Sequence, residues 1–236
     1  MKNGSQISSP QCAILSAKMQ KTPLSGILLL CLLVAVAISP PSLSVAAQRP
    51  HQRDSATISP AQQEHSFIQA LIAGAREEVR RKPLYKSAYY AGGFPPETEG
   101  VCTDLLWRAF AFAGYDLKKR MDADIRKHTT AYPRISKPDP NIDFRRVPNQ
   151  TVFFRRHAET LTTRIDTANM AAWQPGNIVV FTNPDHIAIL SDKRNAKGFP
   201  LLLHNQGPFA TEEDDFAAWY SQGIVAHFRF IPQGLE

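Results

Sequence analysis

A cysteine and two histidines are the residues of this sequence best suited to covalent chemistry. Cys102 lies where a loop rich in glycine and proline runs into an apolar helix. The first turn of a helix presents unpaired backbone N–H groups and the positive end of the helix dipole, and both favour a thiolate. His186 opens an apolar strand and His204 ends the next one, so a meander can bring them side by side. A thiol, an imidazole base and a third group that orients the base form a nucleophilic triad.

The same residues allow simpler interpretations. A free cysteine is often a buried, small apolar residue, and a histidine on a strand often has a structural role. A zinc site could combine Cys102, His186 and His204 with Asp185 or Asp192. However, the sequence has no closely spaced ligand pair such as C-x-x-C. We therefore expect no metal and no cofactor.

The first 46 residues have the features of a secretory signal. Lys18 and Lys21 precede an apolar run at residues 26–38, which is too short to span a bilayer comfortably, and small residues suited to cleavage follow it. We predict a signal peptide at 1–46, a linker at 47–58, a single domain at 59–236, and a periplasmic or secreted protein. Translation from Met19 would give a signal of more usual length. The alternative is an uncleaved anchor, which would be the protein's one membrane contact.

Cleavage of this signal would change both the charge and the cysteine content. The 236 residues carry a net charge of +6, and loss of residues 1–46 removes three lysines and no acid, which leaves +3. Such a small surplus does not indicate nucleic-acid binding. Cys12 and Cys31 leave with the signal, so Cys102 is then the one cysteine of the mature chain. A single thiol in an oxidising compartment strengthens the case for a nucleophile.

Helices are expected before and after the glycine-rich loop. Ser59 and Pro60 are typical of a helix start, an apolar stripe follows, and Pro83 stops the helix. The helix that begins near Cys102 ends at Gly114. The following segment predicts a helical turn at 122–125, an ordered loop at 132–148 and a short helix near 152–161.

The last third of the chain predicts an antiparallel meander. Strands are expected at 178–181, 186–191, 201–205 and 224–230, with a helix at about 213–220. The adjacent arginines Arg145 and Arg146 either lie on a solvated face or bind a carboxylate or phosphate of a substrate.

Several short motifs together resemble an uncharacterised family of bacterial exported proteins. That family in turn looks like a branch of the NlpC-type, papain-like cysteine peptidases. The resemblance covers residues 72–230, and it depends on the segments 90–93, 100–104, 139–143, 145–149, 175–176 with 178–179, 186–187 with Ile189, and 204–205. It implies an α+β, papain-like (NlpC-type) fold, with the cysteine-bearing helix packed on an antiparallel sheet, an N-terminal helix and a long central insertion. Phe144 and Ala188 depart from the pattern, which would have histidine and glycine there.

The resemblance also implies a role for each matching residue. Cys102 corresponds to the nucleophile, His186 to the general base and His204 to the residue that orients the base, with Asn205 as the alternative for that third role. The substrate-binding candidates are Tyr90, near the oxyanion site, together with Asp104, Arg145, Arg146 and Asn205. Segment 118–164 would line or cover the cleft.

These implications define one expected function and two alternatives. We expect an exported, monomeric cysteine hydrolase that cleaves an amide bond in peptidoglycan stem peptides through Cys102, His186 and His204. One alternative is a papain-like lipid acyltransferase or thioesterase. The other is a non-catalytic module that binds the cell envelope.

Overall fold

The computed structural model describes residues 58–182 and 185–233, which belong to one compact unit. The predicted signal peptide and the linker up to residue 57 lie outside the described residues. Within the described ranges, no helix combines the length and the apolar character needed to cross a bilayer.

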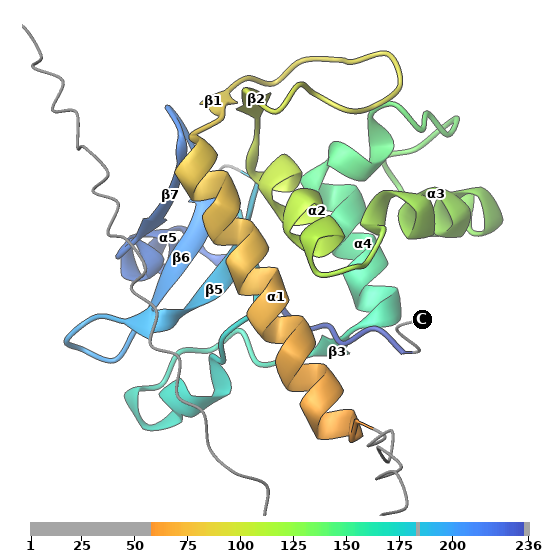
Figure 1. Ribbon diagram of the computed structural model, residues 1–236. Coiled ribbons are helices and arrows are strands. Elements are labelled where there is room, and N and C mark those ends of the chain that lie inside the picture. The colour runs from red at the N-terminus through yellow and green to blue at the C-terminus, as the bar shows by residue number, and fades with distance from the viewer. Residues whose placement is uncertain (1–57, 183–184, 234–236) are drawn as a thin grey trace, which may run out of the picture. The chain divides into compact units, whose positions relative to one another are not determined.

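Two helices position the cysteine. Helix α1 (Pro60–Arg81) is capped by Ser59, as the sequence predicts. The side chain and backbone of Ser59 also exchange hydrogen bonds with Gln62. Helix α2 (Cys102–Phe112) carries Cys102 as its first residue. The two helices lie side by side, and both pack against the sheet (Figure 1). The start of α2 is therefore held between its neighbour helix and the strands.

The central insertion is more helical than the sequence predicted. It contains α3 (Leu117–Lys127), the short helices η1 (Thr129–Ala131) and η2 (Asp143–Arg145), and α4 (Val147–His157). The expectation of a single turn at 122–125 was wrong, because Leu117, Met121 and Ile125 form one buried stripe at a spacing of four residues. Charged residues on the other face of α3 obscured this stripe.

The sheets confirm the α+β class and the antiparallel meander. Strands β1 (Leu84–Tyr85) and β2 (Glu99–Gly100) form a short parallel pair before α2. A six-stranded antiparallel sheet has the order β3-β8-β4-β5-β6-β7. Its strands are β3 (Glu159–Thr160), β4 (Ile178–Phe181), β5 (His186–Arg194), β6 (Pro200–Asn205), β7 (Ala210–Glu213) and β8 (Ile224–Arg229). The short helix η3 (Thr167–Ala172) precedes β4.

One predicted helix starts too early. Glu213 ends strand β7, and the helix α5 (Phe216–Gln222) begins three residues later. Strand β7 forms because it pairs with β6, from Asn205 opposite Ala210 to Leu202 opposite Glu213. This pairing depends on the fold of the whole meander, so the local sequence does not reveal it.

The two faces of the sheet pack against different cores. Ile187, Ile189 and Leu203 face the larger core with α1 and α2. Ala188 and Leu190 face the other side, in a smaller core that also contains Leu202 of β6, Trp173 and two aromatic residues of α5, Phe216 and Trp219. Since side chains alternate along a strand, His186 belongs with the smaller core.

Candidate active site

The two candidate histidines contact each other at one end of the sheet. Nε2 of His186 lies 2.8 Å from Nδ1 of His204, and both side chains are buried. The ring of His186 stacks on Trp219 of α5 with 4.3 Å between the ring centroids. The meander thus places the ends of the two strands side by side, as the sequence predicts.

The two histidines meet where their strands separate. Backbone pairing between β5 and β6 reaches Ile189 opposite Leu203 at this end. Beyond that pair, β5 stays bound to β4 and β6 stays bound to β7, with no further pairing between the two in the described chain. The imidazole contact therefore bridges a split between neighbouring strands.

Cys102 lies next to the same split. It is 5% exposed, and burial raises the pKa of its thiol to about 11. The backbone N–H groups of Ile187 and Thr103 act in the opposite direction but offset only part of this effect. The expected lowering of the thiol pKa by the helix start is therefore wrong for this structure, because desolvation outweighs the backbone dipoles.

The thiol of Cys102 lies beside the backbone of the strand that begins with His186, but the two side chains do not share a hydrogen bond. Cys102 belongs to the larger core, whereas His186 packs on the smaller one, and no bond between their side chains occurs among the described residues. Ile187, whose backbone N–H forms a hydrogen bond with the sulfur and so lowers the thiol pKa, is the residue directly after His186. His204 occupies Nε2 of His186, so the nitrogen nearer to the backbone, Nδ1, is the one not taken by that contact.

The thiol of Cys102 and the imidazole of His186 are both neutral at rest. Burial, with a smaller contribution from the neighbouring His204, lowers the pKa of His186 to about 3. A thiol with a raised pKa and an imidazole with a lowered pKa do not form a standing ion pair. Neither side chain therefore carries a charge that the other could stabilise.

A carboxylate extends the histidine pair. Nε2 of His204 lies 2.9 Å from Oε1 of Glu213, which also accepts hydrogen bonds from Thr211 (2.7 Å) and Gln206 (2.9 Å). His186, His204 and Glu213 are therefore connected by a chain of two hydrogen bonds. Glu213 was not among the candidates from the sequence, because a helix was expected from about residue 213. The available signal was the alternation of side-chain direction along a strand, which places Thr211 and Glu213 on the same face.

Among the described residues, no group of three metal-binding side chains includes Cys102, as the zinc alternative would require. In the described part of the chain, the one group of three donor residues close enough to hold an ion is His204, Glu213 and Asp215, whose donor atoms lie within 4.8 Å of one another. Asp192, a ligand candidate from the sequence, instead pairs with Arg76.

Asn205 contacts backbone groups beside the site. Its amide donates to the carbonyls of Gly100 (3.3 Å) and Pro83 (3.4 Å), and its oxygen accepts from the N–H of Gly207. These bonds tie the end of β6 to the segment that precedes Cys102. His204, rather than Asn205, is the side chain bonded to His186.

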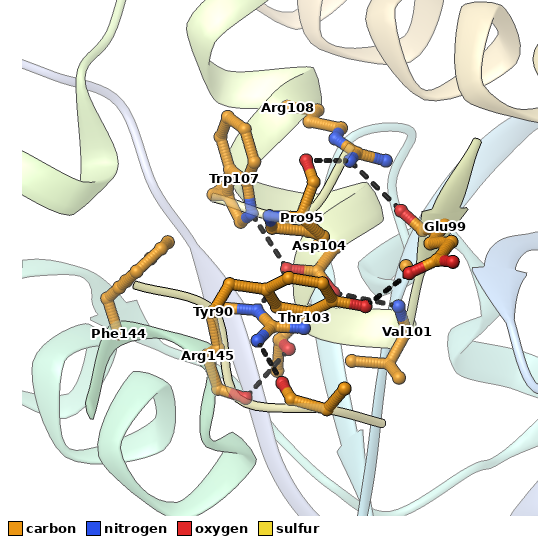
Figure 2. A network of polar contacts seen from close by, with 12 residues as sticks. Tyr90, Pro95, Glu99, Val101, Thr103, Asp104, Trp107, Arg108, Phe144 and Arg145 are labelled. Carbon is orange, nitrogen blue, oxygen red and sulfur yellow. Dashed lines mark hydrogen bonds and ion pairs between the residues drawn. The ribbon is translucent and has the colours of Figure 1, made fainter. Parts of the chain in front are cut away.

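Asp104 and Arg145 brace the first turn of α2 (Figure 2). Asp104 accepts from the backbone N–H of Val101 (2.9 Å) and from Nε1 of Trp107 (3.0 Å), and it forms a two-pronged ion pair with Arg145. Both charged side chains are buried. The structure thus engages these two substrate-binding candidates in positioning α2, whereas Arg146 is exposed.

Two tyrosines flank this network. Tyr90 donates to Glu99 (2.6 Å), and its ring lies 4.9 Å from the guanidinium carbon of Arg145. Tyr85 was not a candidate from the sequence. Burial raises the pKa of the Tyr85 hydroxyl, with smaller contributions from Cys102 and Asp104.

Arg108 fixes the glycine- and proline-rich loop. Its Nη1 donates to buried Glu78 (2.8 Å), and its Nη2 donates to the carbonyl of Pro96 (3.0 Å). The same Nη2 also donates to the carbonyls of Pro95 (3.2 Å) and Glu99 (3.0 Å) (Figure 2). The loop before Cys102 is therefore held by side chains of both α1 and α2.

The thiol is closed off from solvent in this structure. Five surface cavities of the described residues are lined by residues other than Cys102, His186 and His204. The two segments beside the site are bonded to each other, through the N–H of Tyr85 and the carbonyl of Pro208 (2.9 Å) and a bridge between Leu84 and Phe209.

Comparison with known proteins places all of these residues in one matched region. Residues 72–230 match the family model described as "Domain of unknown function (DUF1287)". The uncharacterized protein YijF of Escherichia coli (strain K12) is 36% identical over 172 residues, which is 69% of this chain and 81% of that protein. The family match extends from α1 to the last strand, and it includes Cys102, His186, His204 and Glu213.

Proposed function

Because the chain belongs to the DUF1287 family, whose function its description leaves open, we propose a function from the site itself. The protein is an exported cysteine hydrolase that cleaves an amide bond, with peptidoglycan stem peptides as its substrate. One observation carries this proposal. A bonded pair of buried histidines lies at the strand end against which Cys102, the first residue of α2, is packed.

The arrangement of elements supports a papain-like site. A helix that begins with a cysteine packs on an antiparallel sheet, and the histidines occupy adjacent strands of that sheet. This is the architecture that the resemblance to NlpC-type peptidases implies. That resemblance and the signal-like residues 1–46 are the support for an envelope substrate, and exposed Arg146 is the remaining candidate for binding a substrate carboxylate.

The neutral resting pair calls for general-base catalysis. As Sγ of Cys102 attacks the amide carbon, Nδ1 of His186 takes the thiol proton. Backbone N–H groups at the start of α2 stabilise the oxyanion. The proton then passes to the leaving amine, the C–N bond breaks, and a thioester remains on Cys102. Water, deprotonated by His186, attacks the thioester and releases the acid and the thiol.

Two movements must precede this reaction. The segments joined by Tyr85 and Pro208 separate to admit the substrate, and His186 and Cys102 rotate until Nδ1 and Sγ meet. Hydrogen bonds between catalytic groups are often absent before substrate binds and form in the enzyme–substrate complex. The present geometry therefore corresponds to a closed state.

The test is turnover of defined muropeptides by the mature protein, followed by mass spectrometry. We expect cleaved products, and a thioester adduct on Cys102 at short times. Cys102→Ala and His186→Ala should abolish both, while His65→Ala, which changes an exposed histidine of α1, should not.

The closed thiol and its raised pKa favour one other function, a module that binds the envelope without catalysis. Such a module would give no product, and the Cys102→Ala variant would bind peptidoglycan as well as the wild type does. Equal binding without turnover or adduct would replace the hydrolase proposal.

A further inference from the structure

We propose that Glu213 is a positioning residue that sets the tautomers of His204 and His186 and so leaves Nδ1 of His186 unprotonated. This inference rests on the proposed function for its consequence, because an unprotonated Nδ1 is what a general base at this position requires. The tautomers themselves can be measured without any substrate.

The hydrogen bonds determine which ring nitrogens carry protons, beginning at the carboxylate of Glu213. An ionised carboxylate only accepts, so the 2.9 Å contact requires that Nε2 of His204 carries a proton. A neutral imidazole has one N–H, so Nδ1 of His204 is an acceptor. The 2.8 Å contact between the rings then requires a proton on Nε2 of His186. Nδ1 of His186 is left with a lone pair.

The surroundings of Glu213 keep it ionised. Burial by itself would raise its pKa, but hydrogen bonds from Thr211, Gln206 and His204 outweigh burial and lower it. Burial also lowers the pKa of His204, so this ring is neutral at physiological pH. The chain of donors and acceptors therefore has one direction, from His186 toward Glu213.

Without the carboxylate, the direction of this chain is lost. His204 could then carry its proton on Nδ1 and donate to Nε2 of His186. The proton of His186 would move to Nδ1, where it would block the lone pair that the proposed general base needs. Two arrangements of similar energy would replace one.

Replacing Glu213 by glutamine distinguishes the effect of its negative charge from its effect on the histidine tautomers. Two donors, the Thr211 hydroxyl (2.7 Å) and the Gln206 amide (2.9 Å), point at Oε1 of Glu213. They would hold the carbonyl oxygen of a glutamine in the same place, so that it still accepts from His204. Glu213→Gln should therefore keep the tautomers, whereas Glu213→Ala should lose them.

The measurement is a long-range ¹H–¹⁵N NMR spectrum of the imidazole rings in the mature, unliganded protein. In the wild type, both His186 and His204 should show protonated Nε2 and bare Nδ1. Glu213→Gln should give the same pattern, and Glu213→Ala should give averaged or Nδ1-protonated signals. Glu212→Gln is the matched control, because this neighbour on β7 pairs with Arg76 instead.

Turnover tests the consequence. Loss of the correct tautomer lowers kcat by about 10⁴ in a Ser-His-Asp triad. Here a second ring lies between carboxylate and base, so we expect kcat of Glu213→Ala to fall by about 10² with little change in KM, and Glu213→Gln to restore most of it.

Three results would overturn the assignment. The first is Nδ1-protonated His186 in the wild type. The second is an unchanged NMR pattern in Glu213→Ala. The third is stoichiometric zinc binding that shifts the His204 signals and is lost in Glu213→Ala, since His204 and Glu213 would then be ligands. If the wild type shows the expected tautomers but no turnover, the role of Glu213 stands and the hydrolase proposal is refuted. If the wild type turns over substrate but Glu213→Ala keeps the wild-type tautomers, the hydrolase proposal stands and the role of Glu213 is refuted.

Discussion

Arg145 and Asp104 form a buried ion pair, with Nε–Oδ1 and Nη2–Oδ2 distances of 2.7 and 2.8 Å, that joins the segment leading into α4 to the first turn of α2. The side chain of Asp104 also accepts from the N–H of Val101, the residue before Cys102. This pair therefore fixes the position of Cys102 from a segment about forty residues later in the chain.

Arg145→Ala should destabilise the fold strongly. Removing one partner leaves a buried charge without its counterion, which costs about 3–5 kcal/mol. Denaturant unfolding measures the change, and Arg146→Ala, at the exposed neighbouring position, should stay within about 0.5 kcal/mol. Asp104→Asn combined with Arg145→Gln should be less destabilising than Arg145→Ala, because no charge is left unpaired. Equal effects of Arg145→Ala and Arg146→Ala would contradict the bracing role.

Cys102 should make the protein sensitive to alkaline pH. An unfolded thiol ionises at about pH 8.5, whereas burial raises the folded pKa to about 11. Between these values the unfolded state binds fewer protons, so stability falls as pH rises. Relative to Cys102→Ala, the wild type should lose on the order of 2 kcal/mol by pH 10. Chemical denaturation of both proteins from pH 7 to 10 tests this, and parallel pH curves would argue against a desolvated thiol.

His186 should have the opposite effect at acidic pH. Burial lowers its folded pKa to about 3, while the unfolded imidazole titrates near pH 6.5. As pH falls below 6.5 the unfolded state binds more protons, and stability drops. His186→Gln should remove this dependence, so the wild type should lose on the order of 2 kcal/mol relative to the variant between pH 7 and 5. Exposed His65→Gln is the control, and it should follow the wild type.

Arg108 should control the order of the loop before Cys102. Arg108→Lys keeps a positive charge near Glu78 but loses the planar fork that reaches the three loop carbonyls. We expect faster amide hydrogen exchange at residues 95–100, with exchange in the six-stranded sheet unchanged. Arg80→Lys, on the exposed end of α1, should leave the loop as it is. Uniformly faster exchange throughout the domain would indicate general destabilisation instead.

Elements that depend on local signals could be predicted from the sequence. Ser59 and Pro60 mark the start of α1, and the run at 178–181 forms a strand with the predicted bounds. Cys102 begins its helix because a loop rich in glycine and proline ends there. In each case neighbours along the chain supply the capping group, the turn or the apolar pattern, so no distant contact is needed.

Long-range contacts decided the chemistry of the candidate site. Burial raises the pKa of Cys102 although it lies at a helix start, and the pairing of β7 with β6 brings Glu213 to His204. Arg145 turns out to be the buried partner of Asp104. Desolvation and ion pairing depend on which distant residues surround a group, and the sequence does not state this. The residue types of the site could therefore be predicted from the sequence, whereas their protonation states and partners depend on the packing of the whole domain.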